Sequence, residues 1–156
     1  MIIVPHHQLL SIATSLLPEN PIIIEAGAFW GHDSIKMAQL WPKGAIHAFE
    51  PVPEIFDELV KRTSLMPNII CHQQALSNTN NAITMHLAYK KNRLTQASST
   101  HEPHHRLNIS SIVFPEQITV PATTLTSFTK KNNISSIDLL WLDLQGHEYE
   151  VLSHNV

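Results

Sequence analysis

Apolar and amphipathic segments alternate along the first half of the chain. Residues 6–17 carry apolar side chains at spacings of three and four, which predicts an amphipathic helix. The apolar run at 21–27 predicts a strand buried on both faces, and residues 44–51 repeat that pattern. Each of these two runs is followed by a segment with helical spacing, at 33–40 and at 53–65.

A third apolar run, at residues 68–77, completes a β-α-β-α-β order with short connections. This order is typical of a parallel sheet covered by helices. We therefore predict an α/β fold built on a Rossmann-like, doubly wound and mostly parallel sheet.

The second half of the chain has a weaker pattern. Residues 81–89 predict a strand that either extends the sheet edge or forms a hairpin, and a variable, largely polar loop is expected over 90–115. A short strand and a helix start follow at 118–128, and a fourth core strand is predicted at 137–143. Because a doubly wound sheet normally continues past its fourth strand, we expect the domain to be incomplete at its C-terminus, either as a fragment or with a partner chain supplying the remainder.

Composition narrows the class of protein. The chain has 156 residues, a formal charge of −3 and one cysteine, Cys71. Its length fits a single domain over 1–156, and its negative charge argues against partners such as nucleic acid or an anionic membrane. One cysteine fits a reducing compartment, and the N-terminus lacks the basic region of a signal peptide, so we expect a cytoplasmic protein.

The most informative stretch is IIIEAGAFWGHDS, residues 22–34, where an acid and two of the four glycines follow the first strand. A glycine after a buried strand lets the backbone approach a ligand, although it can also serve packing alone. A dinucleotide turn needs G-x-G-x-x-G, whereas no glycine lies between Gly27 and Gly31. Glu25 would repel a diphosphate and could accept an ammonium group. The turn therefore favours S-adenosylmethionine over NAD.

A second acid ends the next predicted strand, in the sequence IHAFEP. Glu50 lies 23 residues after Gly27, where a carboxylate can accept hydrogen bonds from both hydroxyls of a ribose. Pro51, Val52 and Pro53 follow and would form an apolar shelf for an adenine ring. Together the two acids and the glycine turn describe a site for a nucleoside with an amine at its other end.

Several blocks of the sequence resemble those of FkbM-type S-adenosylmethionine-dependent methyltransferases, in the same order. They are IIIEAGAFWGHDS, GAIHAFEPVPEIFDEL, QQALS, ITVPATTLTSF and IDLLWLDLQGHEYEVL. The resemblance runs from about residue 22 to the end of the chain, and FEPVP and LDLQGHE are its most specific parts. It implies a fold of the class I methyltransferase type, S-adenosyl-L-methionine as cofactor, and a hydroxyl of a small molecule or sugar as methyl acceptor.

The same resemblance implies a set of site residues. Cofactor contacts are expected, within the half of the domain at 22–77, from Glu25, Ala26, Gly27, Gly31, Glu50, Pro51, Val52, Ala75 and Leu76. Asp143 is the first candidate base for an acceptor hydroxyl, and His147 and Glu148 are the next. Asp143 could instead only cap the following helix or hold the cofactor amine. Gln145 replaces a glutamate that is frequent in the family, so one charge is lost there.

The histidine-rich sequence HEPHH raises the question of a metal site. His101, His104 and His105 have offsets of three and four, but Pro103 interrupts any helix that would bring them together. We predict a solvated loop and no metal site. Two other functions remain as alternatives to a methyltransferase: a truncated or non-catalytic nucleoside-binding module of the same fold, and a nicotinamide-dependent oxidoreductase.

Overall fold

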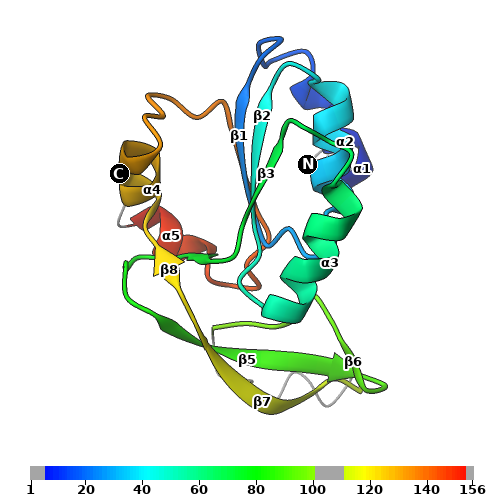
Figure 1. The fold of residues 1–156 in the computed structure, drawn as a ribbon, viewed down its shortest axis with the longest axis vertical. Helices are drawn as coiled ribbons and strands as arrows, with labels where there is room; N and C mark the ends of the chain where they lie inside the picture. Colours follow the sequence, from blue (N-terminus) through cyan, green and yellow to red (C-terminus); the bar gives the residue numbers. More distant parts are fainter. Residues whose placement is uncertain (1–5, 101–110, 154–156) are drawn as a thin grey trace, which may run out of the picture.

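The computed structural model describes residues 6–100 and 111–153. Its central sheet consists of β1 Ile22–Ala26, β2 Ala45–Phe49, β3 Ile69–His72 and β9 Leu139–Leu142. The four strands are parallel and lie in the order β3-β2-β1-β9 (Figure 1). The chain winds outward from β1 to β3 and then returns to pair β9 with the other edge of β1. This reversal is the doubly wound arrangement that the apolar runs predict.

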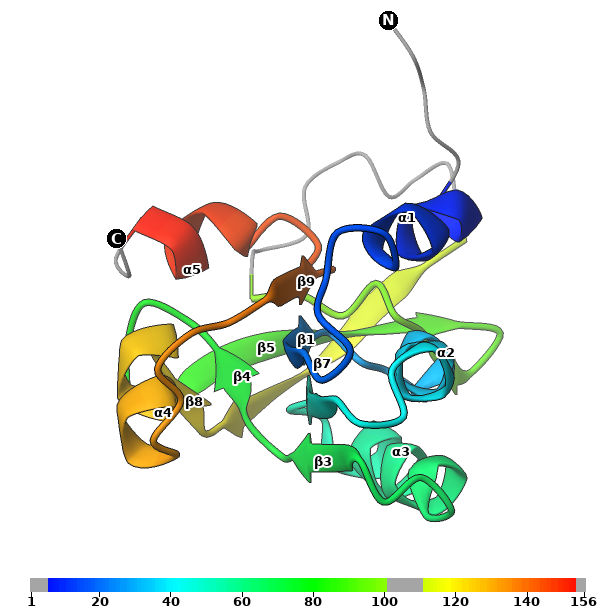
Figure 2. The same ribbon diagram turned by 90° about the horizontal axis from the view of Figure 1, so that it is seen from above.

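Helices cover both faces of this sheet, as Figures 1 and 2 show. One face carries α1 His6–Ala13, α2 His32–Leu40 and α3 Pro53–Thr63, and the other carries α4 Leu125–Lys131 and α5 Glu148–Ser153. Ile23 is fully buried in an apolar cluster that contains Met37 of α2. Its neighbour Ile24 points to the other face and is fully buried in a cluster that contains Phe128 of α4. The apolar run of β1 is therefore explained by burial on both faces.

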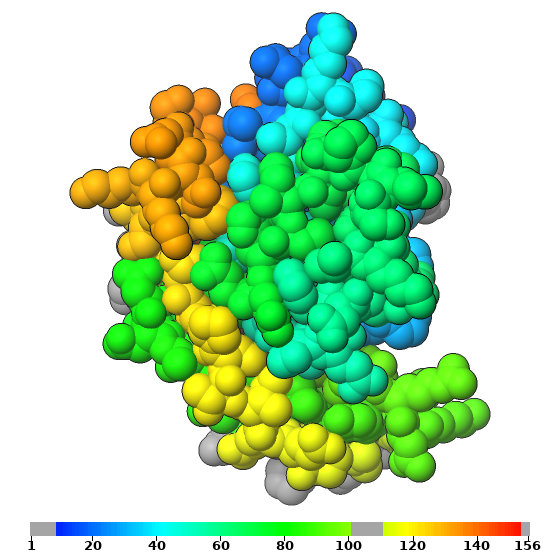
Figure 3. All heavy atoms as spheres, in the orientation of Figure 1, coloured from blue at the N-terminus to red at the C-terminus, as the bar shows by residue number. Residues whose placement is uncertain are grey.

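An antiparallel unit lies across the carboxyl ends of the parallel strands (Figure 1). It consists of β5 Ile83–Lys90, β6 Arg93–Leu94 and β7 Val113–Val120, with β5 paired to both neighbours. The unit forms the lower end of the molecule in Figure 3. Met85 and Val120 of this unit pack in one apolar cluster with Val52, which follows β2. This packing closes one side of the space above the strand ends.

The third predicted strand is divided in the structure. β3 ends at His72, and the chain then leaves the central sheet to form β4 Ala75–Leu76, which pairs with β8 Ala122–Thr123. Local pattern could not separate the two pieces, because both are apolar and their partners are far apart in sequence. The pairing of β4 with β8 joins the antiparallel unit to the domain.

Two other segments differ from the sequence prediction. The first helix ends at Ala13 rather than 17, and Thr14 and Ser15 each donate a hydroxyl hydrogen bond to a carbonyl three residues earlier. Part of the predicted loop 90–115 is ordered as β6 and the start of β7. Lys91 and Asn92 form the two-residue turn between β5 and β6, with φ of 50° and 59°. A left-handed pair of this kind is typical of hairpin turns, so β5 takes the hairpin alternative.

Within the described residues, the structure contains no helix with the length and apolar character needed to cross a membrane.

Candidate active site

The reversal of winding between β1 and β9 places two chain segments in direct contact. Gly27 follows β1 with φ of 86°, and Asp143 follows β9. A Cβ atom on Gly27 would lie 2.1 Å from the backbone carbonyl oxygen of Asp143. Asp143 N–H also donates to the carbonyl of Ala26 at 3.0 Å. A glycine is thus needed at 27 for the ends of β1 and β9 to meet, at the place where doubly wound sheets bind their ligands.

Two adjoining cavities open at this place. The larger has a volume of about 630 Å³ and is mainly apolar, and the smaller has a volume of about 350 Å³ and is mainly polar. Residues lining both cavities are Gly27, Phe29, Gln96 and Asp143. The cavities therefore adjoin beside the glycine turn and could hold the two ends of one elongated ligand.

Most of the predicted cofactor residues line these cavities. Around the larger cavity lie Ala26, Gly27, Glu50, Pro51, Val52, Ala75 and Leu76. Around the smaller cavity lie Glu25 and, again, Gly27. The tertiary structure thus brings together residues from the ends of β1, β2 and β4 that are up to 51 positions apart in the sequence, from Glu25 to Leu76.

Glu50 is a buried acid in the wall of the larger cavity. One carboxylate oxygen accepts from Phe29 N–H at 3.1 Å and the other accepts from Val52 N–H at 2.9 Å. Burial raises the pKa of Glu50 to about 7, although these two hydrogen bonds lower it. Each carboxylate oxygen can accept a second hydrogen bond, so the group is held in place with capacity left for two ligand hydroxyls.

Glu25 is the corresponding acid of the smaller cavity. Its side chain is buried and accepts a hydrogen bond from the Ser34 hydroxyl on α2. Burial raises the pKa of Glu25 to about 8, the Ser34 hydrogen bond lowers it, and the charge of Asp33 raises it. A cationic group entering this cavity would favour the ionised carboxylate and gain its attraction.

Two of the three predicted catalytic residues lie at the cavities. Asp143 lines both of them and accepts a hydrogen bond from the Gln145 amide at 2.7 Å. His147 lines the larger cavity, and its Nε2 lies 3.1 Å from the hydroxyl oxygen of Ser77. Both groups can therefore reach a molecule bound where the cavities adjoin.

Gly31 and Glu148 line neither cavity. A Cβ atom on Gly31 would lie 2.7 Å from Leu59 Cδ1, so this glycine allows the approach of α2 and α3. Glu148 accepts hydrogen bonds from the N–H groups of Leu144 at 2.7 Å and Gly146 at 3.0 Å, which fixes the turn before α5. The structure gives both residues a local role, and their predicted contacts with ligand stay predictions.

The sequence reasoning missed part of the cavity lining. Phe29 lines both cavities in a left-handed conformation, with φ of 50°, which is uncommon for a residue with a side chain. The opposite wall comes from the segment after β6, through Thr95, Gln96, Ser98, Ser99 and Thr100. The cluster of hydroxyl and amide side chains in TQASST was the one signal available for that wall.

No metal cluster of three or more candidate ligands is present among residues 6–100 and 111–153. His101, His104 and His105 lie outside this described part of the chain. Among the described residues, the larger cavity is lined by one histidine, His147, and two acids, of which Glu50 is buried and Asp143 is exposed.

Comparisons with known proteins agree with this geometry. The sequence model of the Methyltransferase FkbM domain matches residues 22–155. The 2-O-methyltransferase NoeI of Sinorhizobium fredii is 26% identical over 152 residues, covering 95% of this chain and 61% of that protein. Methyltransferase sdnD of Sordaria araneosa is 28% identical over 159 residues, covering 87% of this chain and 61% of that protein. The chain thus spans about three fifths of the length of these curated relatives.

One solved structure is similar over most of the chain. The crystal structure of Methyltransferase FkbM from Methylobacillus flagellatus KT gives a TM-score of 0.50 at 12% identity, covering 90% of this chain and 30% of that chain. This similarity, together with the strand order, confirms the predicted Rossmann-like α/β fold.

Proposed function

This chain belongs to the FkbM methyltransferase family, and we propose that it transfers a methyl group from S-adenosylmethionine to an oxygen of a small molecule or sugar. The observation that carries this proposal is the position of two buried acids. Glu25 lines the smaller cavity and Glu50 lines the larger one, and the cavities adjoin at Gly27. This arrangement suits a ligand with an amine at one end and a diol at the other.

The residues of the larger cavity fit the nucleoside half of the cofactor. Glu50 would accept hydrogen bonds from the two ribose hydroxyls while it keeps its backbone partners. Pro51 and Val52 would contact the adenine ring, with Ala75 and Leu76 at its edge. The mainly apolar lining supports this assignment, because an adenine face is apolar and its edge can reach the backbone.

The residues of the smaller cavity fit the amino-acid half. Glu25 would receive the ammonium group, whose charge compensates that of the carboxylate in a buried place. Gly27 would allow the chain between the two halves to pass close to the backbone.

When bound, S-adenosylmethionine supplies the methyl group as part of a sulfonium, so the task of the protein is to align the acceptor. Asp143 is exposed to both cavities and would take the proton of the acceptor hydroxyl through its free carboxylate capacity. His147 is the second candidate for that proton, because its Nε2 is near the Ser77 hydroxyl in the same cavity.

The wall formed by residues 95–100 carries hydroxyl and amide side chains, and this composition supports the assignment of a polar methyl acceptor. Side chains of this kind can donate to and accept from the hydroxyls of a sugar or similar molecule. The name of the relative NoeI, a 2-O-methyltransferase, also supports oxygen as the methylated atom.

The first experiment is a calorimetric titration of the purified chain with S-adenosylhomocysteine, with NAD as the control ligand. Binding of the first in the micromolar range and none of the second is expected. Binding of NAD alone would contradict the proposal. Transfer of tritium-labelled methyl to a panel of sugars and small alcohols then separates an enzyme from a non-catalytic nucleoside-binding module, which would bind without transfer.

A further inference from the structure

The smaller cavity contains an arrangement that the glycine turn does not explain. Among the described residues that line it, three carry a carboxyl group and one, His32, is basic. The carboxyl group of Asp33 is paired with Lys36 at 2.9 Å. A ligand with an ammonium and a carboxylate would need a separate donor for its carboxylate, since Glu25 and Asp143 would repel it. The side chains of Gln96 and Trp141 also carry N–H donors, but among the described lining residues His32 is the one that can combine a donor with positive charge.

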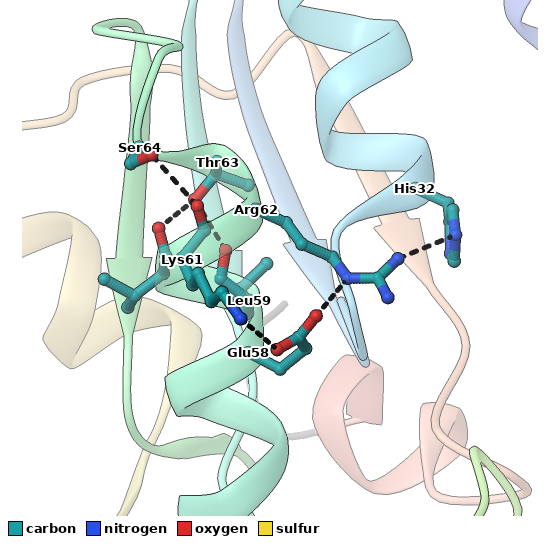
Figure 4. Close-up of polar contacts among 8 residues, drawn as sticks. His32, Glu58, Leu59, Lys61, Arg62, Thr63 and Ser64 are labelled. Atoms are coloured by element: carbon teal, nitrogen blue, oxygen red, sulfur yellow. Dashed lines mark hydrogen bonds and ion pairs between the residues drawn. The ribbon is translucent and has the colours of Figure 1, made fainter.

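His32 is in contact with Arg62 (Figure 4), and Arg62 is not among the residues that line the cavity. Arg62 reaches from α3 towards the start of α2, where its Nη1 lies 3.4 Å from Nε2 of His32. The guanidinium is fixed by two other contacts: its Nε donates to Glu58 at 2.6 Å, and its Cζ lies 4.7 Å from the ring centre of Trp30. Three contacts on one side chain define the direction in which the guanidinium points.

The contact with Arg62 fixes the proton position on the imidazole. A guanidinium donates and does not accept hydrogen bonds, so Nε2 of His32 must be the acceptor. The ring proton of the neutral imidazole is then on Nδ1, which becomes the donor that His32 can offer to a ligand. The positive charge of Arg62, beside Nε2 of the ring, increases the attraction for an anion.

We propose that His32, positioned by Arg62, binds the carboxylate at the amino-acid end of S-adenosylmethionine. This inference rests on the proposed function and adds to it the residue pair, His32 and Arg62, that binds the cofactor carboxylate. Glu25 and the His32–Arg62 pair would then bind opposite charges of the same amino-acid group, which fixes its orientation in the smaller cavity.

The experiment compares two ligands by calorimetry on the full chain. One is S-adenosylhomocysteine, and the other is S-(5′-adenosyl)-3-thiopropylamine, which keeps the amine and lacks the carboxylate. His32→Ala is expected to weaken S-adenosylhomocysteine by about tenfold, through loss of a hydrogen bond to a charged group, and to change the second ligand by less than about twofold. His32→Asn keeps an N–H donor near the position of Nδ1 and is expected to recover part of the loss.

The positioning role of Arg62 has a matched control on the same helix. Lys61 and Arg62 both pair with Glu58, at 3.8 Å and 2.6 Å, but Arg62 alone of the two contacts His32. Arg62→Gln is expected to weaken S-adenosylhomocysteine by about threefold relative to Lys61→Gln, without an effect on the decarboxylated ligand. Circular dichroism of each variant verifies that it is folded.

The outcomes separate this inference from the proposed function. If the wild-type chain binds S-adenosylhomocysteine but His32→Ala weakens both ligands equally, or weakens neither, the carboxylate assignment to His32 is overturned and the proposed function stands. If Arg62→Gln and Lys61→Gln behave alike, the positioning role of Arg62 is overturned. Failure of the wild-type chain to bind either ligand overturns the proposed function and this inference together.

Discussion

The two walls of the cavities are built in different ways. The wall at the ends of β1 and β2 is fixed by backbone hydrogen bonds between parallel strands: Gly27 and Ala28 both donate to the carbonyl of Phe49, at 3.1 Å and 3.0 Å. Its polar side chains are buried acids. The wall at 95–100 is fixed by the antiparallel unit, where Ser99 exchanges backbone hydrogen bonds with His86 at 2.8 Å and 3.1 Å. Its polar side chains are hydroxyls and amides.

This difference indicates which wall would bind the cofactor and which would bind the methyl acceptor. Buried acids with internal partners are costly to place and tolerate little change, because each charge needs its own hydrogen bonds. The hydroxyls and amides of the antiparallel wall are, apart from the buried Ser99, partly or fully exposed, and such side chains can be exchanged at smaller cost. We therefore expect cofactor binding to depend on the parallel-strand wall and acceptor selection to depend on the antiparallel wall.

The largest effect is expected from Gly27→Ala. The added Cβ would collide with the backbone of Asp143, and φ of 86° is strained for alanine, so the free energy of unfolding should fall by about 3 to 5 kcal/mol. Gly31→Ala is the matched control, since φ is 77° there but the nearest atoms belong to the side chains of Leu59 and Thr63, which can shift. Urea unfolding of both variants measures the difference. Equal losses would show that backbone contact between β1 and β9 is not the cause.

Glu50→Ala tests whether the wall at the ends of β1 and β2 binds the cofactor. The variant should lose about 1 to 3 kcal/mol of binding free energy for S-adenosylhomocysteine, because hydrogen bonds to a charged group are removed. Calorimetric titration at constant pH measures this loss. Glu50→Gln keeps an acceptor oxygen for one of the two N–H groups, of Phe29 or Val52, and places an NH2 donor opposite the other. Thermal unfolding of both variants therefore accompanies the titration, to separate a loss of ligand contacts from a loss of local structure. Unchanged affinity in both variants would contradict the ribose assignment.

The buried acids also predict a dependence of stability on pH. Burial raises the pKa of Glu25 to about 8 and of Glu50 to about 7, from 4.5, so the folded state binds more protons and loses stability as the pH rises. His47 and His72 act in the opposite direction below pH 6.5, because burial lowers their pKa values. Between pH 6.5 and 8 the unfolding free energy should therefore fall by about 2 kcal/mol, as measured in urea. Glu25→Gln should flatten this slope, whereas Glu19→Gln, at an exposed acid, should retain it.

The smallest effect is expected on the antiparallel wall. Gln96 is exposed and lines both cavities, so Gln96→Ala should change the unfolding free energy by less than about 0.5 kcal/mol. Its effect on binding of S-adenosylhomocysteine should stay below about 1 kcal/mol, the range of a neutral hydrogen bond. Thermal unfolding and calorimetry test these limits. A loss as large as that of Glu50→Ala would remove the distinction between the walls.

The parallel core could be predicted because its signals are local. A strand buried on both faces needs a continuous apolar run, as at 22–24, and the required glycine at 27 comes directly after it. Glu25 and Glu50 could be assigned to the site because parallel strands bring their carboxyl ends to one edge. Phe29 could not be assigned, because its left-handed backbone is accompanied by a hydrogen bond to Glu50, 21 residues later, which no local pattern indicates.

Local sequence patterns predict the order of the core strands and helices, the glycine turn, and the two acids Glu25 and Glu50 at the ends of β1 and β2. Each of these depends on side chains within a few positions of one another, so local periodicity and turn chemistry carry the information. Three features are visible only in the tertiary structure. They are the closing of the cavities by residues 95–100, the division of the third apolar run into β3 and β4, and the contact of Arg62 with His32. These features depend on pairings between distant segments, whose free energy comes from contacts that no local pattern contains.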